Sequence, residues 1–156
     1  MVHKNIIEMK KRVFILGLLL LSLAGIFSAC KEKETLETQL LENTKWKLIG
    51  FFDTIADTIK IAEPESEMCY LLSFDKNKTL FGISSTNEFQ GSYKIDYSTN
   101  IINITIGQIT EINELFDGKL YIKSLNNVEI FSLIENELRL YYNSKQNYLL
   151  FKSRQL

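Results

Sequence analysis

Short runs in which apolar and polar residues alternate follow one another between residues 45 and 153. The cleanest run spans residues 87–96, where Phe89, Gly91, Tyr93 and Ile95 alternate with polar or charged residues. A period of two places successive side chains on opposite faces of a β-strand, so each run predicts a strand with one buried face. Eight strands are expected, at residues 45–53, 70–74, 79–84, 87–96, 102–106, 128–134, 137–143 and 147–153.

Polar turn-forming residues separate these runs. They fill positions 75–78, 96–100, 135–136 and 144–146, which predicts antiparallel hairpins. The first of these turns also matches the beginning of a calcium-binding loop. However, Leu80 stands where such a loop needs glycine and Thr86 where it needs glutamate, so a plain hairpin turn is expected.

The period changes in residues 117–127. Leu120, Tyr121 and Leu125 follow helical spacing there, and Asp117 stands where a helix N-cap belongs. One short helix is therefore expected. Two further features are irregular: residues 54–67, which contain three glutamates, predict an acidic loop or an edge strand, and a change of apolar face within 128–134 predicts a β-bulge.

Together these elements predict a mainly β fold. About eight antiparallel strands are expected to form a rolled sheet or partly open barrel around one core, with one short α-helix near 117–127. Neither an internal repeat nor a second domain is expected in the mature chain.

The N-terminal residues have the pattern of a secretory signal. Four basic residues within positions 1–12 precede Val13–Phe27, an uncharged apolar run that is short for a bilayer-spanning helix. The run ends in Ser28, Ala29 and Cys30, which resembles the bacterial lipoprotein signal, in which the cysteine becomes the acylated first residue of the mature protein. Cys30 is thus the predicted lipidation site. The alternatives are a plain secretory signal and a membrane anchor with an accidental cysteine.

This pattern predicts three parts of the chain: a signal peptide over 1–29 that is removed, a flexible polar tether over 30–43, and a β domain over 44–156. Lys31 and the acids that follow Cys30 are similar to the surface-export signal of Bacteroidota lipoproteins. We therefore expect the protein at the outer membrane, held by membrane lipid through acylated Cys30, with display on the cell surface as a further possibility.

The charge balance changes when the signal is set aside. The whole chain has a formal net charge of -1, but residues 1–29 hold four bases and one acid, which leaves 14 bases and 18 acids, a charge of about -4, in residues 30–156. An acidic domain is a poor candidate for nucleic-acid binding, so no nucleic-acid partner is expected.

Histidine is missing from the predicted mature chain, because His3 lies in the signal. This excludes a Ser-His-Asp catalytic triad, a Cys-His catalytic dyad and a histidine-ligated zinc site in the mature chain. Cys69, the one thiol left after acylation of Cys30, is expected to act as a small buried hydrophobe. We expect no cofactor and no bound metal.

The sequence also contains residues suited to two other kinds of site, a carboxylate pair for catalysis and a tyrosine-lined binding groove. Acid–base catalysis could use a carboxylate pair, either Glu111 with Glu114 or Glu135 with Glu137, although such residues are usually solvated surface. A carbohydrate or peptide groove could be lined by Tyr97, Tyr141 and Tyr142, although core packing explains the same residues more simply.

From about Leu41 to Phe151 the chain resembles the META/HslJ-like family of exported bacterial proteins. The resemblance rests on the order of the elements and on local motifs, which are the opening segment 41–48, the hairpin 74–82, segment 86–93 with its Gly-x-Tyr, Thr110, Leu120–Leu125 and the closing hairpin 138–151. Thr86 stands where many members have cysteine, so a cysteine pair is not supported here. The resemblance implies a compact antiparallel β fold with a helix and no established activity.

The resulting expectation is a lipid-anchored envelope protein that is not an enzyme. Its β domain is expected to bind an envelope protein or a glycan, or to act in envelope stress. The alternative is a carrier of a small apolar ligand with a lipocalin-like cavity inside the barrel.

Overall fold

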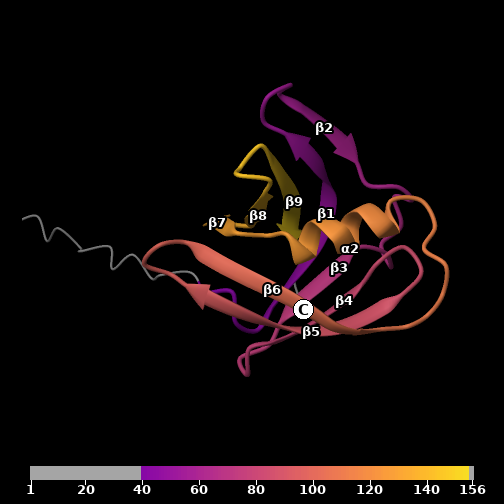
Figure 1. Ribbon diagram of the computed structural model, residues 1–156, viewed down its shortest axis with the longest axis horizontal. Helices are drawn as coiled ribbons and strands as arrows, with labels where there is room; N and C mark the ends of the chain where they lie inside the picture. Colours follow the sequence, from indigo (N-terminus) through magenta and orange to yellow (C-terminus); the bar gives the residue numbers. More distant parts are fainter. Residues whose placement is uncertain (1–39, 155–156) are drawn as a thin grey trace, which may run out of the picture. The chain divides into compact units, whose positions relative to one another are not determined.

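The computed structural model describes residues 40–154 (Figure 1). The predicted signal peptide, Cys30 and most of the predicted tether lie outside these residues. Within them the chain forms nine strands and one helix, labelled as in Figure 1: β1 (Thr44–Asp53), β2 (Thr58–Ile61), β3 (Leu71–Phe74), β4 (Thr79–Ile83), β5 (Glu88–Asp96), β6 (Ile101–Ile109), α2 (Gly118–Asn126), β7 (Ile130–Ile134), β8 (Glu137–Tyr142) and β9 (Asn147–Ser153).

The strands form one antiparallel sheet that returns on itself. Its order is β2-β1-β3-β4-β5-β6-β7-β8-β9, and a further pairing between β9 and β1 completes a ring (Figure 1). Most neighbours share several residue pairs, but β6 and β7 share only Ile101 with Ile130. The predicted mainly β fold with a rolled antiparallel sheet and one short helix is therefore confirmed.

Segment 54–67 contains both of the predicted alternatives. Residues 58–61 form the edge strand β2, which pairs with Gly50–Asp53 of β1, and an acidic loop follows it. All four residues of β2 are exposed. This strand is the one that the eight predicted strands did not include. It shares one edge of β1 with β3, while β9 pairs with the other edge.

Large aromatic side chains fill the interior of the ring. Tyr121 of α2 is fully buried and stands edge-on against Tyr70, with ring centroids 5.5 Å apart. It also lies close to Phe89 and Phe151 from opposite parts of the sheet. Because the alternating apolar residues of the strands point inward, they and the helix make one core.

The helix begins where the sequence predicts, but Asp117 does not cap it through its side chain. One carboxylate oxygen instead accepts a hydrogen bond from the Lys60 ammonium, and the other accepts the Glu63 backbone N–H at 2.9 Å. A cation is a stronger partner for a carboxylate than the helix N–H groups are, so Asp117 binds the end of β2 rather than the helix.

The predicted bulge within 128–134 is wrong. Val128 is buried, but it lies in the connection from the helix, and β7 starts only at Ile130. The irregular pairings occur elsewhere, between Leu48 and Gly50 of β1 and between Gln90 and Gly91 of β5. The connection after α2 thus gives Val128 an inward position without a bulge.

Gly91 lies at the second of these irregularities and allows β5 and β6 to approach closely. A Cβ atom there would stand 2.2 Å from the Thr105 backbone oxygen. We expect Gly91→Ala to lower the free energy of unfolding by about 2 kcal/mol, because backbone of the neighbouring strand would have to move. Urea denaturation followed by the fluorescence of Trp46, the one tryptophan of the chain, measures this. Gly107→Ala is the matched control, since its Cβ would meet only an atom 3.8 Å away; equal losses in both variants would contradict the explanation.

Among the described residues, Leu41 and Glu42 of the predicted tether pack against the β domain. Leu41 is fully buried, and its backbone N–H donates to the Tyr97 hydroxyl at 3.0 Å. Glu42 accepts hydrogen bonds from the Lys78 ammonium and the Tyr97 hydroxyl. Burial acts to raise the pKa of Glu42, but these two bonds outweigh it and the pKa is lowered.

No helix among residues 40–154 has the length and apolar character needed to cross a membrane.

Candidate binding groove

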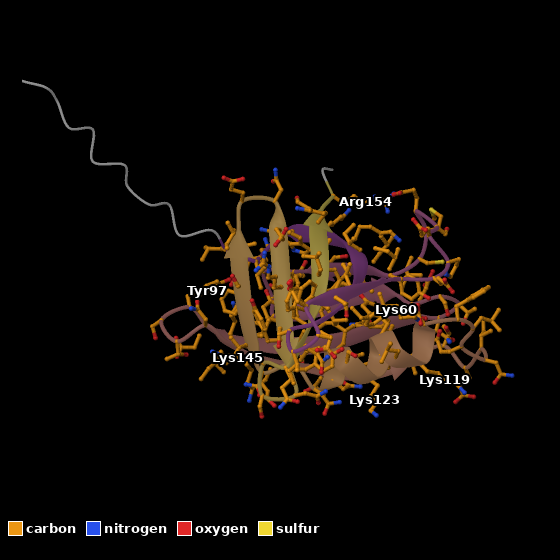
Figure 2. All side chains as sticks on the ribbon, turned by 90° about the horizontal axis from the view of Figure 1, so that it is seen from above. Lys60, Tyr97, Lys119, Lys123, Lys145 and Arg154 are labelled. Carbon is orange, nitrogen blue, oxygen red and sulfur yellow. The ribbon has the colours of Figure 1, made fainter. Side chains whose placement is uncertain are left out.

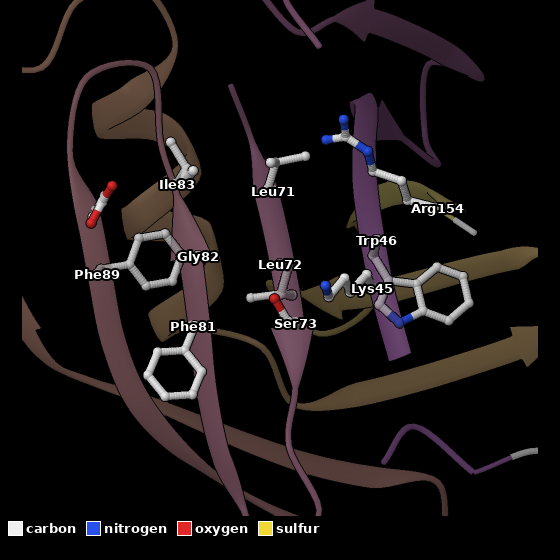
Figure 3. A pocket seen from close by; sticks show the side chains of 11 residues that line it. Lys45, Trp46, Leu71, Leu72, Ser73, Phe81, Gly82, Ile83, Phe89 and Arg154 are labelled. Carbon is white, nitrogen blue, oxygen red and sulfur yellow. The ribbon is translucent and has the colours of Figure 1, made fainter. Parts of the chain in front are cut away.

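A groove of about 560 Å³ runs over β1, β3, β4 and β5 (Figure 3). Its floor is largely apolar, with Leu71 of β3 and Phe81 and Ile83 of β4. Phe81 is 46% exposed, which is unusual for a large aromatic side chain on a strand. Lys45 and Arg154 add positive charge on one side, and Glu88 lies on the other.

Strand pairing explains how distant residues meet in this groove. Lys45 stands opposite Ser73, and Ser73 opposite Phe81, which makes one cross-strand row. The next row joins Lys47, Leu71 and Ile83 in the same way. Figure 3 shows the Lys45 side chain extending from β1 toward Ser73 of β3. Each row therefore passes from a lysine on β1 to an apolar residue on β4.

The positive end of the groove continues onto β9. Lys47 stands directly opposite Lys152, and the Arg154 backbone N–H donates to the Lys45 carbonyl at 2.8 Å. Like charges on facing strands repel each other, so four bases placed here act against stability. Among residues 40–154, Lys152 is the only one of the four in an ion pair, with Glu137 at 2.9 Å.

The Lys47 ammonium contacts carbonyl groups rather than a carboxylate. It donates to the Ser66 oxygen at 2.5 Å and to the Cys69 oxygen at 2.6 Å, which holds the 62–70 loop against β1. Burial lowers the pKa of Lys47. The negative charge of Glu67 acts to raise this pKa and the positive charge of Arg154 to lower it, and the pKa is lowered overall. Lys47 is therefore engaged with the loop, and Lys45 and Arg154 are the cations that line the groove.

Glu114, one of the predicted catalytic acids, lies in a different and fully engaged site. Its carboxylate accepts hydrogen bonds from Ser84 at 2.5 Å, Ser85 at 2.8 Å, Thr86 at 3.2 Å and Asn87 at 2.8 Å. We call these five residues the Glu114 cluster. Burial acts to raise the pKa of Glu114, but the four donors outweigh it and lower the pKa.

The cluster joins the turn after β4 to the segment before α2. Asn87 also donates to the Ile112 carbonyl at 2.7 Å, and it accepts the Ile112 N–H at 2.9 Å. Gly118 makes room for the carboxylate, since a Cβ there would stand 1.9 Å from a Glu114 oxygen. The arrangement fixes two loops, because its hydrogen bonds join residues 84–87 to residues 112–114.

The members of each predicted carboxylate pair have different surroundings. Glu111 is exposed while Glu114 is held in its cluster, and Glu135 is exposed while Glu137 binds Arg139 and Lys152. No hydrogen bond among residues 40–154 joins the members of either pair. In the same part of the chain, no group of three or more His, Cys, Asp or Glu side chains is arranged to hold a metal ion.

The three predicted groove tyrosines lie in three different places. Tyr97 binds Glu42 and packs edge-on against Phe131. Tyr141 packs against Tyr148 on β9, whereas Tyr142 points to the other face of β8 and is buried. The tyrosines therefore do not line one groove.

The 75–78 segment forms the predicted hairpin turn, whereas Cys69, predicted to be buried, is only partly so. Cys69 is partly buried against the core, with its sulfur 3.5 Å from the Ser85 carbonyl oxygen. Asp75 accepts the Asn77 N–H at 2.8 Å and its own N–H donates to the Thr79 carbonyl at 2.8 Å, which closes a hairpin turn.

Comparison with known proteins places the chain in a family. It is 32% identical over 152 residues to a Tannerella forsythia protein named as a lipoprotein, and the match covers 92% of this chain and 97% of that protein. The chain belongs to the family of this lipoprotein. A search against family models finds no match.

A solved structure shares the fold of this chain. The crystal structure of a DUF4847 family protein from Bacteroides vulgatus superposes with a TM-score of 0.60, covering 75% of this chain and 96% of that chain. The two sequences are 15% identical, so this likeness concerns the fold alone.

Proposed function

We propose that the protein is a lipid-anchored envelope protein of the outer membrane, held by acyl chains on Cys30. The family relationship to a lipoprotein supports this proposal, as does the small-residue sequence directly before Cys30. The lysine and acids after Cys30 favour display on the cell surface. The domain over residues 40–154 would then act at the membrane surface.

The proposed role is binding without catalysis. The Ser84 and Ser85 hydroxyls donate to the Glu114 carboxylate and serve to hold it in place. No histidine occurs there to accept a proton from a nucleophile. The filled interior also speaks against the alternative carrier role, because Tyr70, Tyr93 and Tyr121 occupy the space that a lipocalin-like ligand would need.

We further infer that the groove binds an extended acidic segment of another envelope protein. The observation that carries this inference is the meeting of Lys45 and Arg154 with an exposed apolar floor. These cations are concentrated in a domain that is acidic overall, and their placement costs stability. A peptide with alternating acidic and apolar side chains would relieve the repulsion and cover Phe81.

We also propose that the chain is a member of the META/HslJ-like family. The helix between β6 and β7 and the final hairpin stand in the expected order, and Gly91 and Tyr93 each have a structural role: close strand approach and a hydrogen bond from the Tyr93 hydroxyl to the Asp75 carbonyl at 2.8 Å. These agreements support membership at the level of fold.

A labelled peptide tests the groove. We expect a fluorescein-labelled peptide of alternating aspartate and leucine to bind the full-length protein in detergent. Lys45→Glu should weaken binding by about tenfold, because a repulsive charge replaces an attractive one at the groove's edge. Phe81→Ala should also weaken it, and added salt should reduce the affinity of the unaltered protein. Fluorescence anisotropy measures all three effects.

Lys94→Glu serves as the matched control, since Lys94 is an exposed lysine of β5 outside the groove. Its affinity should stay unchanged. Failure of the aspartate peptide to bind, equal binding of the same peptide with lysine in place of aspartate, or an equal loss in Lys94→Glu would overturn the groove proposal.

A further inference from the structure

A second pocket, of about 370 Å³, lies between the end of β1, the helix α2 and the β8–β9 turn. Its volume is within the range of small-molecule sites. Most of its exposed lining is apolar, but six of its ten lining residues have polar or charged side chains: Asp53, Lys123, Ser124, Asn127, Asn143 and Asn147. Of its aromatic lining residues, Phe52 is partly exposed, whereas Phe51 and Tyr142 are buried.

Several of these polar groups retain hydrogen-bonding capacity. Asn143 donates to the Asn147 side-chain oxygen at 3.0 Å, which leaves the Asn143 oxygen and the Asn147 amide group available. Asn127 likewise donates to the Lys123 carbonyl at 2.7 Å and keeps its own oxygen. The ion pairs found among residues 40–154 do not include Lys123. The pocket thus presents both donors and acceptors.

The rim of the pocket is held in an uncommon backbone conformation. Asn143, Ser144 and Lys145 all have positive φ, at 51°, 53° and 68°. Residues other than glycine rarely adopt this region, although asparagine does so more often than most. Thr54 fixes the turn, since its backbone N–H and its hydroxyl both donate to the Gln146 carbonyl at 2.9 Å. The turn therefore keeps Asn143 and Asn147 in place on the pocket wall.

We propose that this pocket binds a neutral saccharide, one or two sugar units in size. Side-chain amides donate and accept at once, as sugar hydroxyls do, and the apolar part of the lining, which includes the partly exposed Phe52, suits the C–H surface of a sugar ring. The charges of the lining balance, with one acid, Asp53, and one base, Lys123, so a neutral ligand fits better than an anion.

The pocket lies far from the place where the described chain begins. β1 starts at Thr44, and its other end, Asp53, lines the pocket about 30 Å away, at about 3.3 Å per residue. Figure 2 shows Arg154 at one end of the β7–β9 strands and Lys123 and Lys145 at the opposite end. The saccharide site is thus separate from the groove, and it does not depend on the groove's proposed partner.

Titration with sugars tests this proposal. Glucose, galactose, mannose and N-acetylglucosamine are each added to ¹⁵N-labelled full-length protein in detergent, and amide signals are followed by NMR. We expect at least one of the four to shift the signals of Asn143, Asn147 and Lys123. Asn147→Ala should then weaken that binding by about tenfold, because an amide that donates to the sugar is removed.

Asn103→Ala is the matched control, since Asn103 is an exposed asparagine of β6 outside the pocket. It should bind as the unaltered protein does. The proposal is overturned if none of the four sugars shifts these signals, if the shifts fall on groove residues such as Phe81 instead, or if Asn103→Ala loses affinity as Asn147→Ala does. Loss of the acidic-peptide interaction would leave this result untouched, so the two proposals fail separately.

Discussion

Replacing Glu114 with alanine is expected to lower the free energy of unfolding by about 3 kcal/mol. Four side-chain donors, including the buried Ser84 and Asn87, would lose a charged acceptor at once. The turn after β4 and the segment before α2 would then lose the group that joins them. Urea denaturation followed by Trp46 fluorescence measures the loss.

The effect of Glu114 should also depend on pH. Its pKa in the folded protein lies below the ordinary value of 4.5, so the folded state favours the carboxylate. The stability that this carboxylate contributes is complete above pH 4.5 and is lost as the pH falls through the lowered pKa. The difference in unfolding free energy between the unaltered protein and Glu114→Ala should therefore shrink when denaturation is repeated on the acid side.

Glu114→Gln separates charge from shape. It keeps one acceptor oxygen but sets an amide group against donors, so we expect an intermediate loss of stability and no dependence on titration at position 114. Glu111→Ala is the matched surface control, because Glu111 is exposed, and should change stability by less than about 0.5 kcal/mol. A Glu114→Ala variant as stable as Glu111→Ala would contradict the structural role of the cluster.

Replacing Cys30 with alanine is expected to release the protein from the membrane. Each buried methylene of an acyl chain contributes about 0.8 kcal/mol, so the several chains of a bacterial lipoprotein hold it in effect permanently, and without them no comparable anchor is expected. Fractionation of cells should find the unaltered protein with the outer membrane and the variant mainly in the soluble fraction. Cys69→Ala is the control, since Cys69 packs against the core, and should stay with the membrane.

The strand pattern could be predicted because burial on one face imposes a period of two. Residues 87–96 show this best: Phe89 and Tyr93 are buried, as their alternation requires. The helix over 118–126 could be predicted for a similar reason, since Tyr121 and Leu125 are fully buried. β2 was harder to predict, because all four of its residues are exposed and no buried face marks it as a strand.

The candidate sites depend on pairings that the sequence does not display. Lys45, Lys47 and Arg154 are visible as charges, but only the pairing of β1 with β9 brings them together. Glu114 was considered as an acid because of its neighbour Glu111, whereas its actual partners lie 27 to 30 residues earlier in the chain. The Ser-Ser-Thr-Asn run at 84–87 was the available signal, since such a run of donors suits a carboxylate.

Metabolic labelling with palmitate tests the lipid anchor most directly. Cells that produce the unaltered protein or Cys30→Ala are grown with labelled palmitate, and the purified proteins are compared at equal amounts. The account predicts that the unaltered protein carries the label and that Cys30→Ala carries none. Equal labelling of the two proteins, or no label on either, would contradict a lipid anchor at Cys30.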